Sequence, residues 1–564
     1  MRMARLPLLI LSLALTAPMV PAQEVADTGG RRQLETDEII DRMGQSERAV
    51  LERMKTYQPL METYLQSVAP DETRGWIPTD DNYFLGQFHY DVTPTLSPLT
   101  RREPKKRRMV RALGSSTPNL GDAFATMVTP DWRLLERKRY QFKYVRREFL
   151  GESRCFVFDV KPLREGKDGF VGRIWIEDRD YTLVRFNGVN HRSDQMLSSL
   201  FKRTLSLHVD AWRVNVAAGV WVPSYVYSEE TDLDGAASAQ QRARFKSQTR
   251  IWGYQAQGPD SSGSLTTIRI DEPNVADISD ASAQLSPVLS ERRWEQEAEA
   301  NVLERLEAAG LLAPAGPADA ILETVLNNLI VTNSLNLDRP LRCRILLTSP
   351  LESFTIGRTI VLSRGLVDVL PDEASLATML AHELSHVVLG HALIDTKFAF
   401  ADRLMIADGE LLQVLQFHRT PREEASADDK VIELLGKSPY RDKLGDAGLF
   451  LRAVADQAKQ LPHLIRPHIG DYLAANGQTR LAELMQKAPQ LMPDNLEQVA
   501  ALQLGARLVV DPWSGKLALD RTPAVPLTSV REKVPFAVTP VMPVIRYTGS
   551  PDAGTAVRTV GEVR

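Results

Sequence analysis

Residues 382–386 read His-Glu-Leu-Ser-His, and residues 424–428 read Glu-Ala-Ser-Ala-Asp. On a helix, His382 and His386 stand four positions apart and share one face, so both imidazoles can bind the same metal ion. Glu383 lies on the adjacent face, where it can act on a water at the metal without being a ligand. The first segment therefore predicts two metal ligands and one catalytic base.

The second segment supplies the remainder of a zinc site. Glu424 and Asp428 also stand four positions apart on a predicted helix, the first as a third ligand and the second as a carboxylate that orients a ligand imidazole. Catalytic zinc takes three protein ligands and keeps one position open. We therefore expect one zinc ion per chain, bound by His382, His386 and Glu424.

Local signals place both segments on helices. Pro371-Asp372-Glu373 begins the first helix, and an apolar stripe runs along it. For the second helix, Thr420 fits the N-cap, Pro421 the first helical position, and Glu423 completes a capping box. His391 is out of register with the ligand face, so we interpret it as a structural residue or as one that supports a ligand from behind.

Further motifs surround these segments. A predicted strand at 342–348 precedes a second strand at 359–363, which leads into Arg364-Gly365-Leu366-Val367. With Glu424, Ala427 and Asp428, they resemble the zinc metallopeptidase family of the CAAX prenyl protease, HtpX and BepA, over about residues 285–500. The resemblance implies a gluzincin-like endopeptidase acting on a protein or peptide. It also implies an extended substrate along 359–363 as an edge strand; the predicted contacts are Phe354, Thr359, Ile360 and Val361.

The sequence departs from the family in two places. The family has an Asn-Ala-Phe-like segment where this chain has Glu352-Ser353-Phe354, and a Glu side chain cannot donate the hydrogen bond of an Asn. The family also has a His-Pro followed by an Arg, and here the two halves are separated, at 466–468 and at Arg480. The resemblance makes His468 the candidate catalytic residue that stabilises the transition state, with His463 as the alternative.

The N-terminal half has a different pattern. Residues 35–67 have an amphipathic helical pattern, and from 82 to about 256 short alternating runs with turn residues between them predict an antiparallel sheet on which this helix packs. This half, about 35–256, resembles the LolA-type lipoprotein carrier domains, whose half-open barrels hold lipid acyl chains. The fold class expected for the whole chain is α+β, with a mainly helical zincin-type domain and a small sheet after the β domain.

Composition and the positions of turn and linker residues predict five segments. Residues 1–22 have basic residues, a short apolar run and a small-residue cleavage site, which predicts a signal peptide and a periplasmic or secreted protein. The others are a β domain at 23–256, a Gly- and Ser-rich linker at 257–287, the peptidase domain at 288–500, and a hairpin with an extended tail at 501–564.

Charge and cysteine content limit the partners. The net charge of −4 gives no field that attracts nucleic acid. The basic run at 101–111 is either a solvated loop or a contact with anionic lipid or a membrane surface. Cys155 and Cys343 are predicted to be buried free thiols. The oligomeric state is left open. The rival hypothesis is a lipid- or lipoprotein-binding, chaperone-like envelope assembly factor with a non-essential zinc domain.

Overall fold

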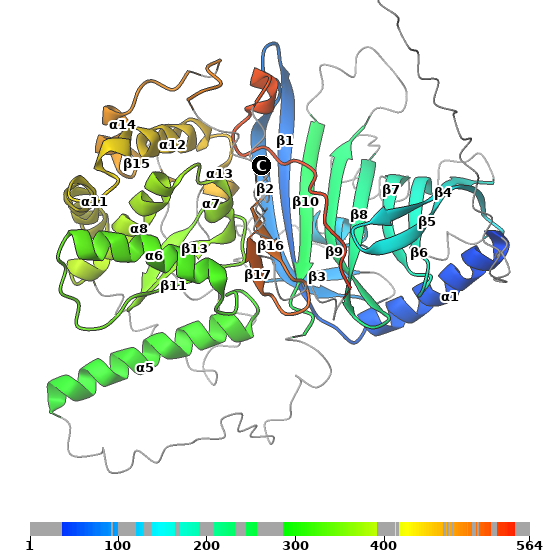
Figure 1. Ribbon diagram of the computed structural model, residues 1–564, viewed down its shortest axis with the longest axis horizontal. Helices are drawn as coiled ribbons and strands as arrows, with labels where there is room; N and C mark the ends of the chain where they lie inside the picture. Colours follow the sequence, from blue (N-terminus) through cyan, green and yellow to red (C-terminus); the bar gives the residue numbers. More distant parts are fainter. Residues whose placement is uncertain are drawn as a thin grey trace, which may run out of the picture.

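The computed structural model describes the following residues: 36–91, 94–99, 120–128, 137–163, 170–190, 207–231, 244–255, 286–391, 412, 417–465, 470, 473–475, 478–492, 494–498, 504, 507–519 and 527–547. The predicted signal peptide, the basic run at 101–111, His468 and most of the predicted linker lie outside them. The described elements form a large sheet on one side and a group of helices on the other (Figure 1).

The large sheet has ten strands in the order β3-β2-β1-β10-β9-β8-β7-β6-β5-β4. Every pair of neighbours is antiparallel. The strands are β1 Leu60–Asp71, β2 Gly75–His89, β3 Thr95–Pro98, β4 Tyr140–Leu150, β5 Ser153–Pro162, β6 Phe170–Glu177, β7 Leu183–Asn190, β8 Leu207–Ala217, β9 Val220–Glu230 and β10 Arg244–Trp252.

Two helices accompany this sheet: α1 Thr36–Met54 and α3 Leu120–Ala125. The apolar face of α1, with Ile39 and Met43, joins Phe156 and other sheet residues in one buried cluster, which confirms the predicted packing. The predicted helix at 35–67 is too long, however. The helix ends at Met54, and the chain continues as strand β1.

The second part is mainly helical. Its helices are α5 Pro287–Ala308, α6 Pro317–Thr332, α7 Arg364–Val369, α8 Glu373–Val388, α11 Pro421–Gly436, η5 Arg441–Lys443, α12 Leu444–Gln457, α13 Pro462–Ile465, α14 Ala482–Lys487 and η6 Val530–Glu532. Its strands are β11 Arg342–Leu346, β12 Ser353–Ile356, β13 Thr359–Ser363, β14 Ala474–Ala475, β15 Gln478–Thr479, β16 Leu508–Val510 and β17 Leu517–Leu519. Helices with a small sheet after a large antiparallel sheet confirm the α+β class.

The small sheet has the order β11-β13-β12. Strand β13 pairs with β11 in parallel and with β12 in antiparallel orientation. The prediction that 359–363 is an edge strand is therefore wrong, because both edges of β13 are already paired. The edge next to helix α8 belongs to β12.

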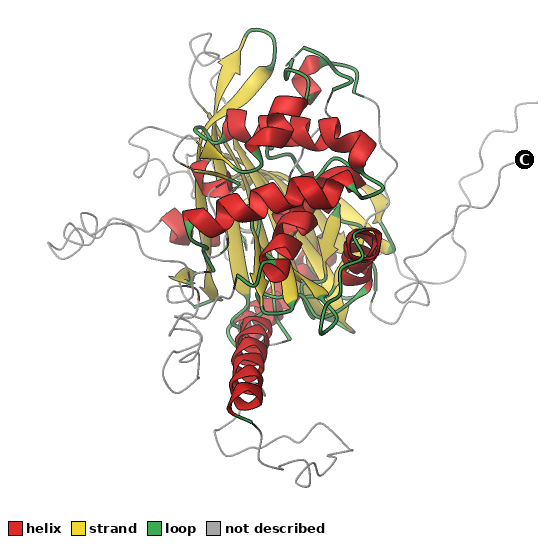
Figure 2. Ribbon diagram, turned by 90° about the vertical axis from the view of Figure 1, so that its left-hand side faces the viewer, coloured by secondary structure: helices red, strands yellow, loops and turns green. Residues whose placement is uncertain are grey.

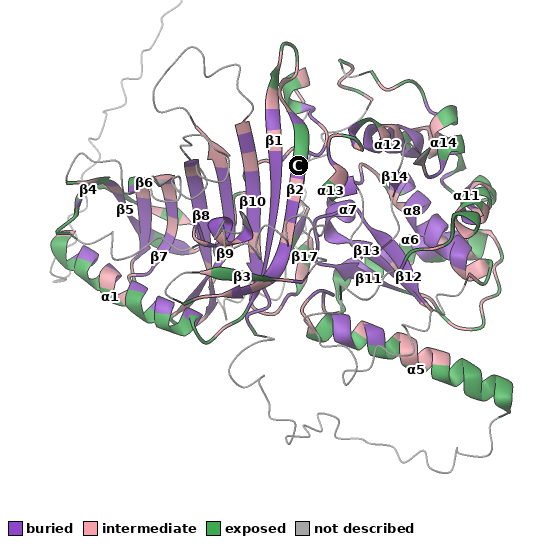
Figure 3. Ribbon diagram, turned by 180° about the vertical axis from the view of Figure 1, so that it is seen from behind, coloured by how far each residue is buried: buried purple, intermediate pink, exposed green. Residues whose placement is uncertain are grey.

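The two parts share one hydrophobic core, which contains Leu60 and Tyr64 of the large sheet as well as Leu306 and Leu346 of the helical part. Seen from the helical side, the helices lie in front of the large sheet (Figure 2). Helix α8 and the small sheet are mostly buried, whereas the N-terminal half of α5 is exposed (Figure 3). The site that α8 carries is thus built into the interior.

The C-terminal segment 527–547 runs across the large sheet (Figure 1). The side-chain amide of Gln66 donates to the Phe536 carbonyl at 2.7 Å and accepts from the Val538 N–H at 2.9 Å. This part of the predicted tail is therefore anchored to the protein. Cys155 and Cys343 are buried free thiols, as predicted. None of the described helices is long and apolar enough to cross a membrane.

Candidate metal centre

Helix α8 brings two histidines to one point. Asp372 caps its N-terminus, where the carboxylate accepts from the Ser375 N–H at 2.7 Å. The helix packs its apolar side against the small sheet and α11, which leaves His386 fully buried and His382 3% exposed. Their Nε2 atoms lie 3.1 Å apart. Two such nitrogens facing each other in the interior need a shared partner.

Helix α11 supplies the carboxylate. Thr420 and Glu423 form the predicted capping box, and the Glu424 N–H already donates to the Thr420 carbonyl at 3.0 Å. The cap thus fixes Glu424 in the first turns of the helix. Glu424 Oε2 lies 3.2 Å from His382 Nε2, and Oε1 lies 3.8 Å from His386 Nε2.

These three side chains fit a metal ion. One ligand atom from each lies within 4.8 Å of the others. Tetrahedral zinc with ligands at about 2.0–2.2 Å holds them about 3.3 Å apart, close to the two shorter separations here. Neither carboxylate oxygen of Glu424 receives a hydrogen bond of good geometry from the described residues. A half-buried carboxylate next to two buried imidazole nitrogens suits a divalent cation.

Asp428 lies behind His382, as the spacing predicts. Its Oδ1 lies 3.1 Å from His382 Nδ1, and its Oδ2 accepts from the Leu481 N–H at 2.8 Å. Burial and the Arg480 guanidinium lower the pKa of His382, but Asp428, Glu424 and Glu383 outweigh them and raise this pKa to about 9. A metal binds the neutral imidazole, so a metal ion and a proton compete for His382.

His391 contacts the outer side of the other histidine. Its Nδ1 lies 2.9 Å from His386 Nδ1, and its Nε2 lies 3.3 Å from the Ser426 hydroxyl. Burial lowers the pKa of His391, which favours the neutral ring that such a chain of hydrogen bonds needs. His391 thus supports His386 from behind and does not join the group of metal-facing atoms.

Glu383, the predicted base, is fully buried beside the histidines. Its Oε1 accepts from the Ser353 hydroxyl at 2.6 Å and its Oε2 from the Thr355 hydroxyl at 2.8 Å. Both donors lie on the edge strand β12. The carboxylate is therefore held by the small sheet.

Arg480 is a site residue that the sequence analysis noted only as half of a split motif. Its Nη1 lies 2.9 Å from His382 Nε2 and its Nη2 lies 2.5 Å from Glu424 Oε2. It follows the β14–β15 hairpin, and the next residue, Leu481, has a left-handed backbone with φ of 57°. The lone pair of His382 Nε2 can accept either a hydrogen bond or a metal ion. Metal binding at Nε2 therefore requires the Arg480 guanidinium to move away from this nitrogen.

The four predicted substrate contacts lie on two different strands. Thr359, Ile360 and Val361 lie on the central strand β13, whose backbone is paired on both sides. Phe354 lies on the edge strand β12, where its ring stacks on Phe417 at a centroid distance of 4.6 Å. All four residues of β12 are buried although it is an edge strand, and both Phe417 and Arg419 contact it.

The structure describes one of the two histidines that were candidates for stabilising the transition state. His468 lies outside the described residues. The side chain of His463 is exposed on the short helix α13, and its backbone N–H donates to Asp81 of the large sheet at 2.9 Å. His463 therefore marks the contact between the two parts of the chain.

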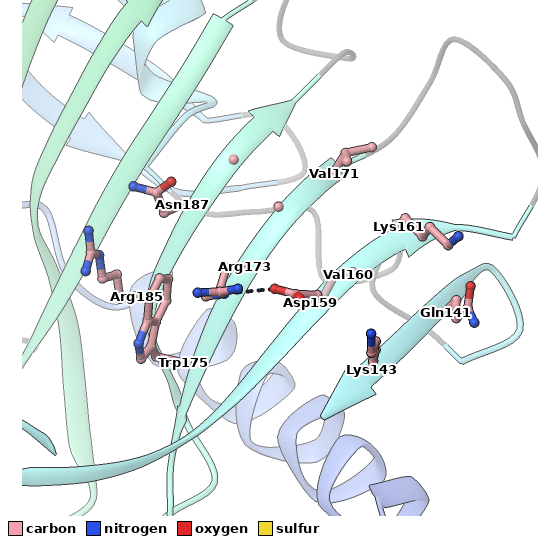
Figure 4. Close-up of a pocket in the computed structure, with 12 residues that line it drawn as sticks. Gln141, Lys143, Asp159, Val160, Lys161, Val171, Arg173, Trp175, Arg185 and Asn187 are labelled. Atoms are coloured by element: carbon pink, nitrogen blue, oxygen red, sulfur yellow. Dashed lines mark hydrogen bonds and ion pairs between the residues drawn. The ribbon is translucent and has the colours of Figure 1, made fainter. Parts of the chain in front are cut away.

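The large sheet carries a groove of about 750 Å³ on strands β4 to β7 (Figure 4). Four cationic side chains line it, Lys143, Lys161, Arg173 and Arg185. Arg173 pairs with Asp159 at 2.8 Å across the floor. Arg185 pairs with Asp210 at 2.7 Å, so two of the four cations have a carboxylate partner.

Several solved structures are similar to part of this chain. A putative outer membrane lipoprotein-sorting protein domain from Vibrio parahaemolyticus is 11% identical, with 38% of this chain and 91% of that chain covered and a TM-score of 0.19. A LolA superfamily protein from Nitrosomonas europaea is 10% identical, with 39% and 92% covered and a TM-score of 0.17. At these TM-scores the likeness carries no argument about fold or ligand.

No curated protein matches the chain. Residues 320–438 match the model of Peptidase family M48. The matched range contains both metal-binding segments, 382–386 and 424–428, and all of strands β11 to β13. The match confirms, for residues 320–438, the resemblance to this family of metallopeptidases.

Proposed function

We propose that the chain is an exported zinc-dependent endopeptidase that hydrolyses peptide bonds of envelope or misfolded proteins. The observation that carries the proposal is the meeting of His382, His386 and Glu424 from two separate helices, with Glu383 next in sequence to the first ligand. A purely structural zinc site has no use for an additional buried carboxylate of this kind. The match to an M48 peptidase model over the same segment supports the reaction class.

The three ligands would hold the ion, and Asp428 would keep His382 in the tautomer that presents Nε2. Zinc in such a site acidifies a water to a pKa of about 7 and polarises a carbonyl. Glu383 then takes a proton from the attacking water at a carboxylate oxygen and passes it to the nitrogen of the leaving amine. Arg480, displaced from His382 but still beside Glu424, offers a cation to the developing oxyanion.

The peptide would bind along the edge strand β12 and add one strand to the small sheet. Backbone pairing of this kind gives affinity with loose sequence preference, as expected for an enzyme that acts on unfolded segments. Residues 417–419 would have to leave β12 first, because Phe417 and Arg419 contact it. Export enters the proposal from the sequence pattern of residues 1–22.

Glu383→Gln tests the proposal directly, because the amide keeps the shape of the side chain but cannot accept a proton. Zinc content and cleavage of an unfolded protein such as casein are measured for the parent and the variant. We expect one zinc per chain in both proteins and cleavage only by the parent. A zinc-loaded parent that cleaves nothing would overturn the proposal and favour the alternative, a lipid- or lipoprotein-binding envelope factor.

A further inference from the structure

Two hydroxyl groups hold the catalytic carboxylate. Ser353 and Thr355 stand two residues apart on β12, so both side chains point to the same face of the strand, toward α8. Each donates to a different oxygen of Glu383, at 2.6 and 2.8 Å. Ser353, Thr355 and Glu383 are all at most 2% exposed.

The arrangement restricts the carboxylate more than burial alone does. A buried carboxylate without donors is costly, so at least one partner is expected. Here there are two short donors, each with a single side-chain torsion before the hydroxyl. They rise from a strand that is itself paired with β13. Together they fix the tilt and the rotation of the carboxylate plane.

The hydroxyls leave the carboxylate able to react. Each oxygen of an ionised carboxylate has two acceptor sites, and each hydroxyl uses one of them. The two hydroxyls therefore use two of the four acceptor sites of the carboxylate. The sequence of this strand differs at this point from the Asn-Ala-Phe-like segment of the family it resembles, since a Ser stands where that segment has Ala.

We propose that Ser353 and Thr355 are positioning residues for Glu383. They hold its carboxylate in the orientation from which it takes the proton of the attacking water. The peptide substrate would also pair with β12. The same strand would therefore position both the catalytic base and the substrate. This inference rests on the proposed endopeptidase function.

The alternative is that the hydroxyls merely satisfy a buried charge. Both roles predict some loss of stability when the hydroxyls are removed. Only positioning predicts a lower kcat at unchanged KM and zinc content, because the substrate and the metal are bound by other groups. Positioning also predicts that removing the hydroxyls has no further effect on kcat in a Glu383→Gln background, because the effects of substitutions at residues that act together are not additive.

The test compares Ser353→Ala, Thr355→Val and the double variant with the parent. Thr348→Val is the matched control, because Thr348 is also buried but its hydroxyl has no hydrogen-bond partner among the described residues. We expect the double variant to lose about 10- to 100-fold in kcat, the scale of a small misplacement of a catalytic group. KM and zinc content should stay within twofold, and Thr355→Ser, which keeps the hydroxyl, should recover most of the rate.

A crystal structure of the zinc-loaded double variant gives a readout that does not depend on activity. We expect the Glu383 carboxylate to rotate away from its parent orientation. An unrotated carboxylate, or a kcat within twofold of the parent, overturns the positioning role. A zinc-loaded parent without any cleavage overturns the proposed function instead, and the orientation of Glu383 still decides whether the hydroxyls hold it.

Discussion

Glu424 is the predicted third ligand, and it comes from a different helix than the two predicted histidine ligands. Removing an outer partner of a metal ligand typically costs about 10- to 100-fold in affinity. We expect Glu424→Ala to cost at least about 100-fold, because it removes the ligand itself. Zinc content after dialysis against a weak chelator measures the loss.

Glu433→Ala is the matched control for this experiment. Glu433 lies on the same helix but is exposed and pairs with Lys430 and Lys437. It should keep one zinc per chain. If Glu424→Ala keeps its zinc as firmly as the control does, the third ligand lies elsewhere and the predicted site is wrong.

The sequence predicted the ligands but not the whole site. His382, His386, Glu424 and Asp428 stand at a spacing of four on helices with clear start signals, and the structure brings them together as expected. Arg480 could not be placed in this way. Its approach depends on the β14–β15 hairpin and on the left-handed backbone of Leu481, which no local pattern encodes.

At the scale of elements, periodicity predicted an antiparallel sheet between residue 82 and about residue 256 but misassigned β1. The first seven residues of β1 are buried on both faces, so the alternation that marks a half-exposed strand is missing. Glu62, Thr63 and Gln66 in this segment are polar, so no apolar pattern in the sequence predicts that it is buried. The prediction that residues 359–363 form an edge strand was wrong for another reason. Which strand lies at the edge depends on pairing with other segments, and the sequence of one strand does not show this pairing.

The cap of α11 connects local structure to the metal centre. The Thr420 hydroxyl accepts a hydrogen bond from the Glu423 N–H, and the Glu423 carboxylate accepts one from the Thr420 N–H at 2.9 Å. Thr420→Ala should lower the free energy of unfolding by about 1 kcal/mol, the usual value for a lost cap.

The same change should weaken zinc binding, because Glu424 lies in the first turns of the loosened helix. Urea denaturation and competition with a chromogenic chelator measure the two effects. Thr420→Ser keeps the hydroxyl and serves as the control. Zinc affinity equal in all three proteins would show that the cap stabilises the helix without positioning the ligand.

For the whole molecule, the buried contact between the two parts argues against independent domains. Glu62 of β1 accepts from the Arg364 guanidinium at 2.8 Å and from the Ser349 hydroxyl at 2.7 Å, and both charged side chains are at most 2% exposed. We expect a single unfolding transition by fluorescence and by circular dichroism.

Glu62→Ala leaves the buried Arg364 without its carboxylate, which should lower the free energy of unfolding by about 3–5 kcal/mol. Glu38→Ala is the control, because Glu38 forms an exposed pair with Arg42 on α1 and should cost less than about 1 kcal/mol. Urea denaturation gives both values. Equal losses in the two variants would mean that the contact between the parts contributes little.

Asp81 makes this contact sensitive to pH. It is 1% exposed on β2 and accepts from the backbone N–H groups of His463 and Leu464 on α13. Burial raises the pKa of Asp81 to about 6, although these hydrogen bonds and the His463 charge oppose the shift. In the unfolded chain an Asp has a pKa of about 3.9, so the folded protein binds this proton more tightly.

A proton held more tightly by the folded state stabilises it at low pH, and this stabilisation is lost as the pH rises from about 4 to about 6. The loss is on the order of 3 kcal/mol. Asp81→Asn has no proton to lose, so the zinc-loaded variant should lack this component, and its free energy of unfolding should fall less over that window than that of the parent. Other carboxyl groups titrate in both proteins and cancel in the difference. Parallel curves for the two proteins between pH 4 and 6 would show that Asp81 titrates normally and that the two parts of the chain are joined without a pH-sensitive contact.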